Sequence, residues 1–263
     1  MKICYAQHGE DLVLARALGW GCPGFYVDVG AAHPTTLSVT RLFYERGWHG
    51  VNVDPLPFMI ESLQRARPRD INLQVALSDN SGEATFYKVA AEGCNERTLG
   101  TGLSTLDPEI ADEHRRDGYQ ITESRIRVCT LDEILEQHAP PTIDFLKLDV
   151  EGHESAVLAG LDLVRFRPRI MLIEAVLPLT DIPCHDDWEP RLLESGYHFA
   201  TSDGVNRYYV RDEDRPLARE LRPLHPSEYV RISSHGVFTF ARGRVKLWEA
   251  RAKNWLGRDR RAA

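Results

Sequence analysis

The chain has 263 residues, of which 43% are hydrophobic and 27% charged, and this length is sufficient for one large domain with a substantial core. No apolar run approaches the length that a membrane-spanning helix needs, and acids at Glu10 and Asp11 interrupt the N-terminus before a signal-like segment develops. The five cysteines are scattered without a C-x-x-C pair, so we expect neither a disulfide framework nor a structural zinc site, and we expect a cytoplasmic protein.

The formal net charge of −7 is unevenly distributed. Residues 241–263 hold eight Lys or Arg against two acids, which gives this tail +6 and leaves −13 on the remainder. An acidic body argues against an enzyme that tracks a nucleic-acid backbone. The basic tail, with Trp248 and Trp255 on one helical face, is expected either to be a solvated helix face or to contact the body, an acidic partner or an anionic membrane surface. Assembly of the chain into an oligomer is a separate possibility.

Short apolar runs alternate with helical patterns along the chain, without internal repeats. In chain order the pattern predicts strands at 25–30, 50–54, 71–77, 83–89, 143–150 and 169–176, followed by two strands around the Asp203-Gly204 turn within 197–211. Helices are predicted at 36–46, at 57–66, after the capping box Thr130–Glu133, and from about His153 to Gly160. This alternation favours an α/β fold, with a mostly parallel sheet covered by helices on both faces.

Two segments fall outside this alternation. Residues 89–107 contain several glycines and no periodicity, so we expect a long lid-like loop over the edge of the sheet. We expect one domain over residues 1–211 and a C-terminal extension over 212–263, which contains a strand and the basic, tryptophan-containing helix.

Acids stand at or just beyond nearly every strand end, where an open α/β sheet binds its ligands. They are Asp28, Asp54, Asp79, Asp149 with Glu151, and Glu174. So many carboxylates are costly to desolvate unless they meet a cation, hydroxyl donors or a metal ion. The carboxyl ends of the parallel strands are therefore the expected binding site.

The turn "DVGAAHP" after the first strand indicates the kind of ligand. Gly30 and Ala31 lack bulk, so a ligand can approach the backbone, and Asp54 at the end of the second strand is well placed to bind both hydroxyls of a ribose. The turn lacks G-x-G-x-x-G, which favours a ribose-containing ligand without phosphates, such as S-adenosylmethionine. Capping of the next helix is the alternative role for Asp28 and Asp54.

Seven segments in order resemble the FkbM-family methyltransferases, in particular the branch found with genes for sugar and polysaccharide assembly. They cover most of residues 5–211 and read AQHGEDLVLARAL, GFYVDVGAAHPTTLSVTRLFYERGWHGVNVDPLP, RPRDINLQVALSD, GLSTLDPE, VCTLDEIL, IDFLKLDVEGHESAVLAGLD and RPRIMLIEA. The resemblance implies a class I methyltransferase (Rossmann-like) fold, S-adenosylmethionine as the donor, and methyl transfer to a hydroxyl oxygen.

The resemblance also implies roles for individual residues. Asp28, Gly30 and Ala31 would line the methionine end of the donor, Asp54 would bind the ribose, and the adenine would be flanked by Ala76, Leu77 and Ser78. Many relatives have Glu-Pro where this chain has Asp54-Pro55, and the shorter acid should still reach a ribose.

A hydroxyl acceptor needs help to lose its proton, from a general base or from a metal. The candidates for catalysis are Asp149, Glu174 and His33, although His33 has the alternative of bonding only the following backbone. Lys147 shares a strand face with Asp149 and would pair with an acid or keep a reactive carboxylate ionised. Proton removal can be imagined in two ways. In the first, a side chain alone accepts the proton, and in the second, Asp149 and Glu174, with Asp203 or Asn206, hold a magnesium ion. The metal-free version is preferred because no compact metal motif is readable, so no metal ligand is assigned.

The acceptor is expected to be a sugar, a glycan or a glycosylated small molecule. Its site would be shaped by Ser104, Thr105, Asp203, Asn206 and Arg207, with Tyr208 and Tyr209 as ring faces or as ordinary half-buried strand residues. A nicotinamide-dependent oxidoreductase or epimerase is one alternative, but the glycine fingerprint and a Tyr-x-x-x-Lys pair are missing. A non-catalytic, donor-binding scaffold module is the other.

Overall fold

The protein is described by a computed structural model, which covers residues 2–90, 102–233 and 236–238. Within these residues a central sheet has the strand order β10-β11-β9-β8-β2-β3-β4. Its five parallel strands are β2 (Phe25–Val29), β3 (His49–Asp54), β4 (Ile71–Gln74), β8 (Phe145–Leu148) and β9 (Ile170–Glu174). Strand β11 (Asn206–Arg211) runs antiparallel to β9, and β10 (Tyr197–Ser202) runs antiparallel to β11.

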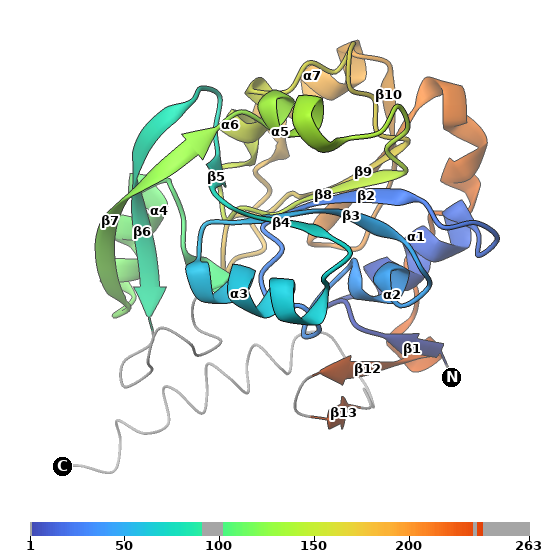
Figure 1. The fold of residues 1–263 in the computed structure, drawn as a ribbon, viewed down its shortest axis with the longest axis horizontal. Helices are drawn as coiled ribbons and strands as arrows, with labels where there is room; N and C mark the ends of the chain where they lie inside the picture. The colour runs from blue at the N-terminus through green and yellow to red at the C-terminus, as the bar shows by residue number, and fades with distance from the viewer. Residues whose placement is uncertain (1, 91–101, 234–235, 239–263) are drawn as a thin grey trace.

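Helices cover both faces of this sheet (Figure 1). On one face lie α5 (Leu131–His138), α6 (Glu154–Ala159) and α7 (Glu189–Glu194), and on the other lie α1 (Glu10–Leu18), α2 (Arg41–Tyr44) and α3 (Pro57–Ala66). Side chains alternate between two large apolar clusters, so that Leu146 packs into one cluster and Phe145 into the other. Burial on both faces explains why the central strands are continuously apolar.

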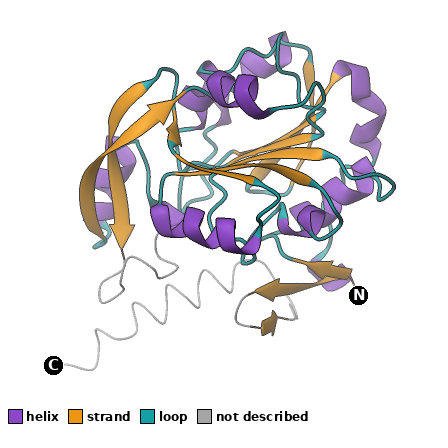
Figure 2. Ribbon diagram, viewed as in Figure 1, coloured by secondary structure: helices purple, strands orange, loops and turns teal. Residues whose placement is uncertain are grey.

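Two smaller sheets flank the central one (Figure 2). Beside its β4 edge, β5 (Ala76–Leu77), β7 (Gln120–Cys129) and β6 (Gly82–Ala90) form a sheet that packs with α4 (Pro108–Arg116). The other consists of β1 (Lys2–Cys4), β12 (Tyr229–Ser233) and β13 (Gly236–Phe238). The short 3-10 helices are η2 (His185–Asp187), η3 (Asp212–Arg219) and η4 (Pro226–Glu228).

Several sequence predictions are confirmed. The mostly parallel sheet with helices on both faces is present, and the helix predicted at 57–66 has these bounds. The hydroxyl oxygen of Thr130 accepts a hydrogen bond from the Glu133 amide at 3.2 Å, as expected for the start of α5. Strands β10 and β11 form the predicted hairpin around Asp203-Gly204.

Two predicted elements are wrong in extent. The helix expected at 36–46 is reduced to α2, because Leu37 has a φ of 58° and the hydroxyls of Ser38 and Thr40 bind groups outside this segment. A left-handed residue cannot continue a right-handed helix. The strand expected at 71–77 is two strands, since β4 pairs with β3 and β5 pairs with β7 in the flanking sheet.

The expected appendages fall largely outside the described residues. These include residues 91–101 of the lid-like loop and the basic tail from residue 239. The separate C-terminal extension stays a prediction, but Leu221, Leu224 and Tyr229 pack into the same apolar cluster as α1. Among the described helices, none is long and apolar enough to cross a membrane.

Candidate active site

The carboxyl ends of β2, β3, β8 and β9 meet at one edge of the central sheet. The register pairs Asp28 with Lys147 across β2 and β8, and Glu174 with Asn206 across β9 and β11. Paired residues on neighbouring strands point to the same face. The sequence-predicted residues of the strand ends are therefore brought together by the parallel sheet.

Gly30 allows the loop after β2 to pass close to the loop after β8. Its φ is 74°, and a Cβ atom at this position would lie 1.8 Å from the carbonyl oxygen of Asp149. The amides of Gly30 and Ala31 both donate to the carbonyl of Val53, at 2.9 and 3.1 Å. Only glycine combines this backbone conformation with this approach. The result is a close backbone contact of the two loops, here called the cradle, at the switch point of the sheet, where such folds bind ligands.

Asp28 lies beneath this cradle. Its side chain is 2% exposed, and one carboxylate oxygen accepts a hydrogen bond of 2.6 Å from the hydroxyl of Thr40. The other oxygen lies 3.6 Å from Nζ of Lys147. A carboxylate covered in this way does not present its oxygens to a ligand, so Asp28 supports the loop from below. Asp28 was expected to line the donor site, but in this arrangement it would act through the loop that it supports and not through its own carboxylate.

Asp54 fastens the same loop from the neighbouring strand. Its carboxylate accepts hydrogen bonds from the amides of Ala32 at 2.9 Å and Leu56 at 2.8 Å, and the residue is 5% exposed. Burial raises the pKa of Asp54 to about 6. Each oxygen accepts one backbone amide and keeps a second lone pair, and the predicted contact of Asp54 with a ribose stays a prediction.

Lys147 joins the two sides of the cradle. Its ammonium donates to the carbonyl of Gly30 at 2.7 Å and pairs with Asp149 at 3.2 Å. Burial lowers the pKa of Lys147, but the charges of Asp149 and Asp28 outweigh this effect and raise the pKa above its ordinary value. The ammonium therefore remains charged beside Asp149. Asp149 itself is 35% exposed and is accessible to a ligand.

Glu151 and Glu174 complete an acidic group around Asp149. One oxygen of each of the three side chains lies within 4.8 Å of the others. Burial, followed by the charge of Asp149, raises the pKa values of Glu151 and Glu174 well above the ordinary range. The backbone turn at Glu151 (φ 57°) is held by Glu154, whose Oε1 accepts from the amide of Val150 at 2.8 Å. These shifts favour the protonated form of both glutamates.

His33 bonds the backbone that follows it, which is the alternative role expected for this residue. Its Nδ1 accepts hydrogen bonds from the amides of Thr35 at 3.1 Å and Thr36 at 2.9 Å. An imidazole whose Nδ1 accepts two backbone hydrogen bonds carries its proton on Nε2 when neutral. Neither nitrogen then has a lone pair ready for the proton of an acceptor. The geometry does not fit His33 as the general base.

The residues expected around adenine lie in and after β5. Ala76 and Leu77 are 6% and 3% exposed, and the hydroxyl of Ser78 lies 3.1 Å from Nε2 of His153, the residue before α6. Burial lowers the pKa of His153, which favours its neutral form. Ser78 is the partly exposed member of this group, and His153, in the N-cap position of α6 without a side-chain capping bond, contacts Ser78.

The residues expected around an acceptor divide into three groups. Thr105 is 1% exposed and its hydroxyl accepts from the amide of Asp107, while the hydroxyl of Ser104 accepts from the amide of Val89, so both serve local structure. Asn206 lies opposite Glu174 in the sheet register. Asp203 accepts from the amide and from Nδ2 of Asn206.

Arg207 lies on the opposite face of the sheet from Asn206. Its guanidinium binds the hydroxyl of Tyr209 at 2.8 Å and Oε1 of Glu189 at 2.6 Å, and it stacks on Phe199 at 4.0 Å. Side chains alternate along a strand, so Arg207 and Tyr209 are turned away from the acids. The expectation that Arg207 lines the acceptor site does not fit this arrangement.

The sequence reasoning assigned no role in the site to His8 and Glu10, at the start of α1. Glu10 is 3% exposed, its Oε1 accepts from Nδ2 of Asn206 at 3.3 Å, and it lies 3.7 Å from Nδ1 of His8. Burial lowers the pKa of His8, but the hydrogen bond and charge of Glu10, together with the charge of Asp203, outweigh it and raise the pKa above its ordinary value. His8, Glu10 and Asp203 form a second group of ligand-type side chains. These residues lie in the segment AQHGEDLVLARAL quoted for the resemblance, but nothing in that segment indicated contact with residue 206.

Comparison with known protein families gives a match for this chain. A family profile described as "Methyltransferase FkbM domain" matches residues 28–199, more than half of the chain. This range begins within β2, ends within β10 and includes the cradle, Lys147 and the acidic group. A search of curated proteins gives no match.

Proposed function

Because the chain belongs to the FkbM methyltransferase family, whose members transfer methyl groups, we propose that it is an S-adenosylmethionine-dependent O-methyltransferase. The proposed acceptor is a hydroxyl of a sugar, a glycan or a glycosylated small molecule. The observation that carries this proposal is the ion pair of Lys147 with the partly exposed Asp149 beside the glycine cradle.

The cradle fits a donor that is cationic and carries no phosphate. Acids surround the cradle, and the one basic group described there, Lys147, is already paired with Asp149 and Asp28, so it is not left to bind a phosphate. When bound, the donor supplies an electrophilic methyl group on a sulfonium sulfur. The loop from Gly30 to Ala32 would hold its methionine part, Asp54 its ribose, and Ser78 the region of the adenine.

Asp149 is the proposed proton acceptor. Transfer forms a bond between the acceptor oxygen and the methyl carbon, breaks the carbon–sulfur bond, and moves the hydroxyl proton to the Asp149 carboxylate. Lys147 holds this carboxylate at 3.2 Å and fixes its orientation. Glu174 and Glu151, whose pKa values are raised well above the ordinary range, are hydrogen-bond donors to the acceptor in this scheme.

The polar groups on the β11 side support an acceptor rich in hydroxyls. Asn206 continues the row of strand ends beyond Glu174, and Glu10, His8 and Asp203 surround it. Amide and carboxylate groups can each bind several sugar hydroxyls.

We propose that proton removal needs no metal ion. A cation at Asp149 would compete with the ammonium of Lys147, and the protons favoured on Glu151 and Glu174 would have to leave. Excess EDTA should therefore leave the rate unchanged. A rate that falls with EDTA and returns with magnesium would instead assign the three acids to a cation.

Titration calorimetry with S-adenosylmethionine and with NAD, followed by a panel of glycans and nucleotide sugars, tests the proposal. We expect binding of the first ligand only, and methylated product from at least one acceptor. A folded protein that binds NAD instead would support the oxidoreductase alternative. Donor binding without turnover across the panel would support a scaffold module.

A further inference from the structure

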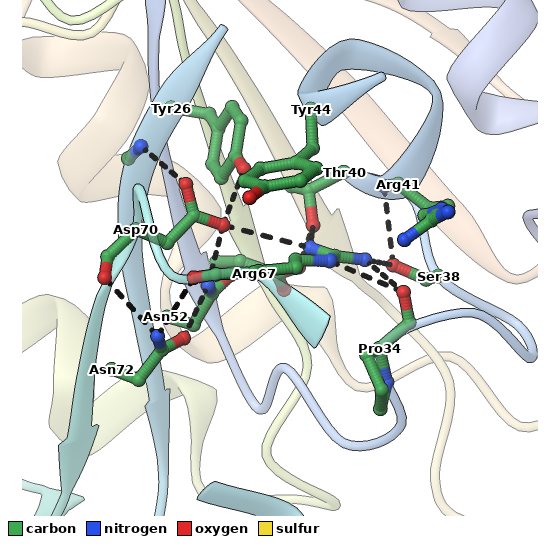
Figure 3. A network of polar contacts seen from close by, with 12 residues as sticks. Tyr26, Pro34, Ser38, Thr40, Arg41, Tyr44, Asn52, Arg67, Asp70 and Asn72 are labelled. Carbon is green, nitrogen blue, oxygen red and sulfur yellow. Dashed lines mark hydrogen bonds and ion pairs between the residues drawn. The ribbon is translucent and has the colours of Figure 1, made fainter. Parts of the chain in front are cut away.

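A fully buried arginine lies under the loop that follows β2. Arg67 is 0% exposed, and its guanidinium donates to the carbonyl of Pro34, the hydroxyl of Ser38 and the hydroxyl of Thr40 (Figure 3). The bond to Thr40 measures 2.7 Å. A charged group is kept in such a place only when hydrogen bonds satisfy it. All three of these partners belong to the segment between β2 and α2.

The nearby acid Asp70 does not compete with the loop for the N–H groups of Arg67. Asp70 lies 4.0 Å from the guanidinium, and its carboxylate is occupied by the hydroxyl of Tyr26 at 2.7 Å, Nδ2 of Asn52 at 2.9 Å and the amide of Gly50 at 3.1 Å. Asp70 therefore balances the charge of Arg67 without forming the usual two-point pair. The N–H groups of Arg67 are directed to the loop, as Figure 3 shows.

The loop needs such support. Ala32 and Leu37 have φ values of 48° and 58°, and neither is a glycine. Backbone of this kind persists only where its surroundings fix it. Arg67 binds at three points between residues 34 and 40, on both sides of Leu37.

Thr40 carries this support to the donor cradle. Its hydroxyl accepts from Arg67 and has one hydrogen, which it donates to Asp28 at 2.6 Å. Asp28 faces Lys147 at 3.6 Å, and Lys147 holds the carbonyl of Gly30 at 2.7 Å. An unbroken chain of polar contacts thus runs from a fully buried arginine to the wall of the cradle.

We propose that Arg67 and Thr40 are positioning residues for the donor site. They touch no ligand, but they fix the loop and the orientation of Asp28, and through Asp28 the place of Lys147. This inference rests on the proposed function, because it takes the cradle as the site of S-adenosylmethionine.

Thr40→Val and Thr40→Ser test the chain of contacts. Valine keeps the shape of threonine and loses the hydroxyl, so we expect its affinity for S-adenosylmethionine and S-adenosylhomocysteine to fall about tenfold in calorimetry. Serine keeps the hydroxyl and should stay within about threefold of the wild type. Equal affinity in wild type and Thr40→Val would overturn the inference alone. A wild-type protein that binds neither ligand would overturn the proposed function, and the inference with it.

Tyr197→Phe is the matched control for lost stability. It removes a buried hydroxyl that donates to the carbonyl of Pro168 at 2.8 Å, outside the Arg67 network. It should lower the melting temperature as Thr40→Val does but leave donor affinity unchanged. If it weakens the donor equally, the loss in Thr40→Val is general and the inference fails.

Ser38→Ala provides a second variant in case Thr40→Val does not fold. It removes one acceptor of the same guanidinium without touching Asp28. We expect about a threefold loss of donor affinity, since Arg67 keeps its bonds to Pro34 and Thr40. Unchanged affinity in Ser38→Ala would argue against the role of Arg67 in holding the loop.

Discussion

Asp28 and Asp149 end neighbouring parallel strands and share one lysine, but they lie in different surroundings. The side chain of Asp28 is 2% exposed and is held by Thr40, whereas that of Asp149 is 35% exposed and is held by Lys147 at 3.2 Å. A covered carboxylate can organise a loop, and a partly exposed one can exchange a proton with a ligand. The difference in exposure therefore assigns Asp28 to the support of the donor loop and Asp149 to the proposed chemistry at the strand ends.

Asp149→Asn tests the reactive side and should have the largest effect. The amide keeps the shape of the side chain but cannot accept a proton, so kcat should fall about 1,000-fold, which corresponds to about 4 kcal/mol. Donor affinity should change little, because Gly30 and Asp54 are untouched. Single-turnover kinetics with saturating donor measures the first quantity and calorimetry the second. An unchanged rate would remove Asp149 from the chemistry.

The pH dependence of stability tests the buried side through Asp54. Burial raises the pKa of Asp54 from 3.8 to about 6, so between these pH values the folded protein binds more protons here than the unfolded chain. The free energy of unfolding must then fall as the pH rises through this window, by at most about 3 kcal/mol.

Chemical denaturation of the wild type and of Asp54→Asn isolates this contribution. The variant has no titrating group at this position, so the difference between the two profiles should follow the pKa of Asp54 and level off above pH 6. Parallel profiles would show that Asp54 is not the buried, loop-fastening acid described above.

The sequence predicted the positions of the strand ends better than the roles of their residues. Asp28, Asp54, Asp149 and Glu174 were all expected at one edge, because the pattern of apolar strands fixes where parallel strands end. Whether such an acid is covered depends on groups far along the chain. Arg67, 39 positions after Asp28, is linked to it through Thr40.

The same limit explains what sequence reasoning missed at the acceptor side. Glu10 contacts Asn206 across 196 positions, and no local pattern shows such a pair. Arg207 was expected in the site with the whole segment 203–208, as a hydrogen-bonding group for a glycan, whereas neighbouring strand residues point to opposite faces. The helix expected at 36–46 was lost for the related reason that its hydroxyls serve Arg67 and Asp28.

Asp28→Asn should have a smaller effect of a different kind from that of Asp149→Asn. It leaves Lys147 with a single carboxylate, at Asp149, and weakens a charge-assisted hydrogen bond from Thr40, so we expect a loss of about 2 kcal/mol in the free energy of unfolding. Donor affinity should fall with it, while kcat at saturating donor stays within about fivefold of the wild type. A large loss of kcat at saturating donor would show that Asp28 takes part in the chemical step together with Asp149. The distinction between a supporting and a reactive acid would then be wrong.

Arg207→Met should have the smallest effect, and it extends the comparison to the two faces of β11. The substitution removes the ion pair with Glu189 and the stacking on Phe199, which are together worth about 1 kcal/mol of stability at a partly exposed position. Neither kcat nor the acceptor KM should change, because the side chain faces away from Glu174.

Asn206→Ala is the matched variant on the site-facing side of the same strand. It removes the contacts with Glu10 and Asp203, so the acceptor KM should rise while donor affinity holds. A rise of the acceptor KM in Arg207→Met instead would mean that the acceptor reaches round the edge of the sheet to its other face. The side chain of Arg207 would then belong to the acceptor site after all, as its place in the sequence first indicated.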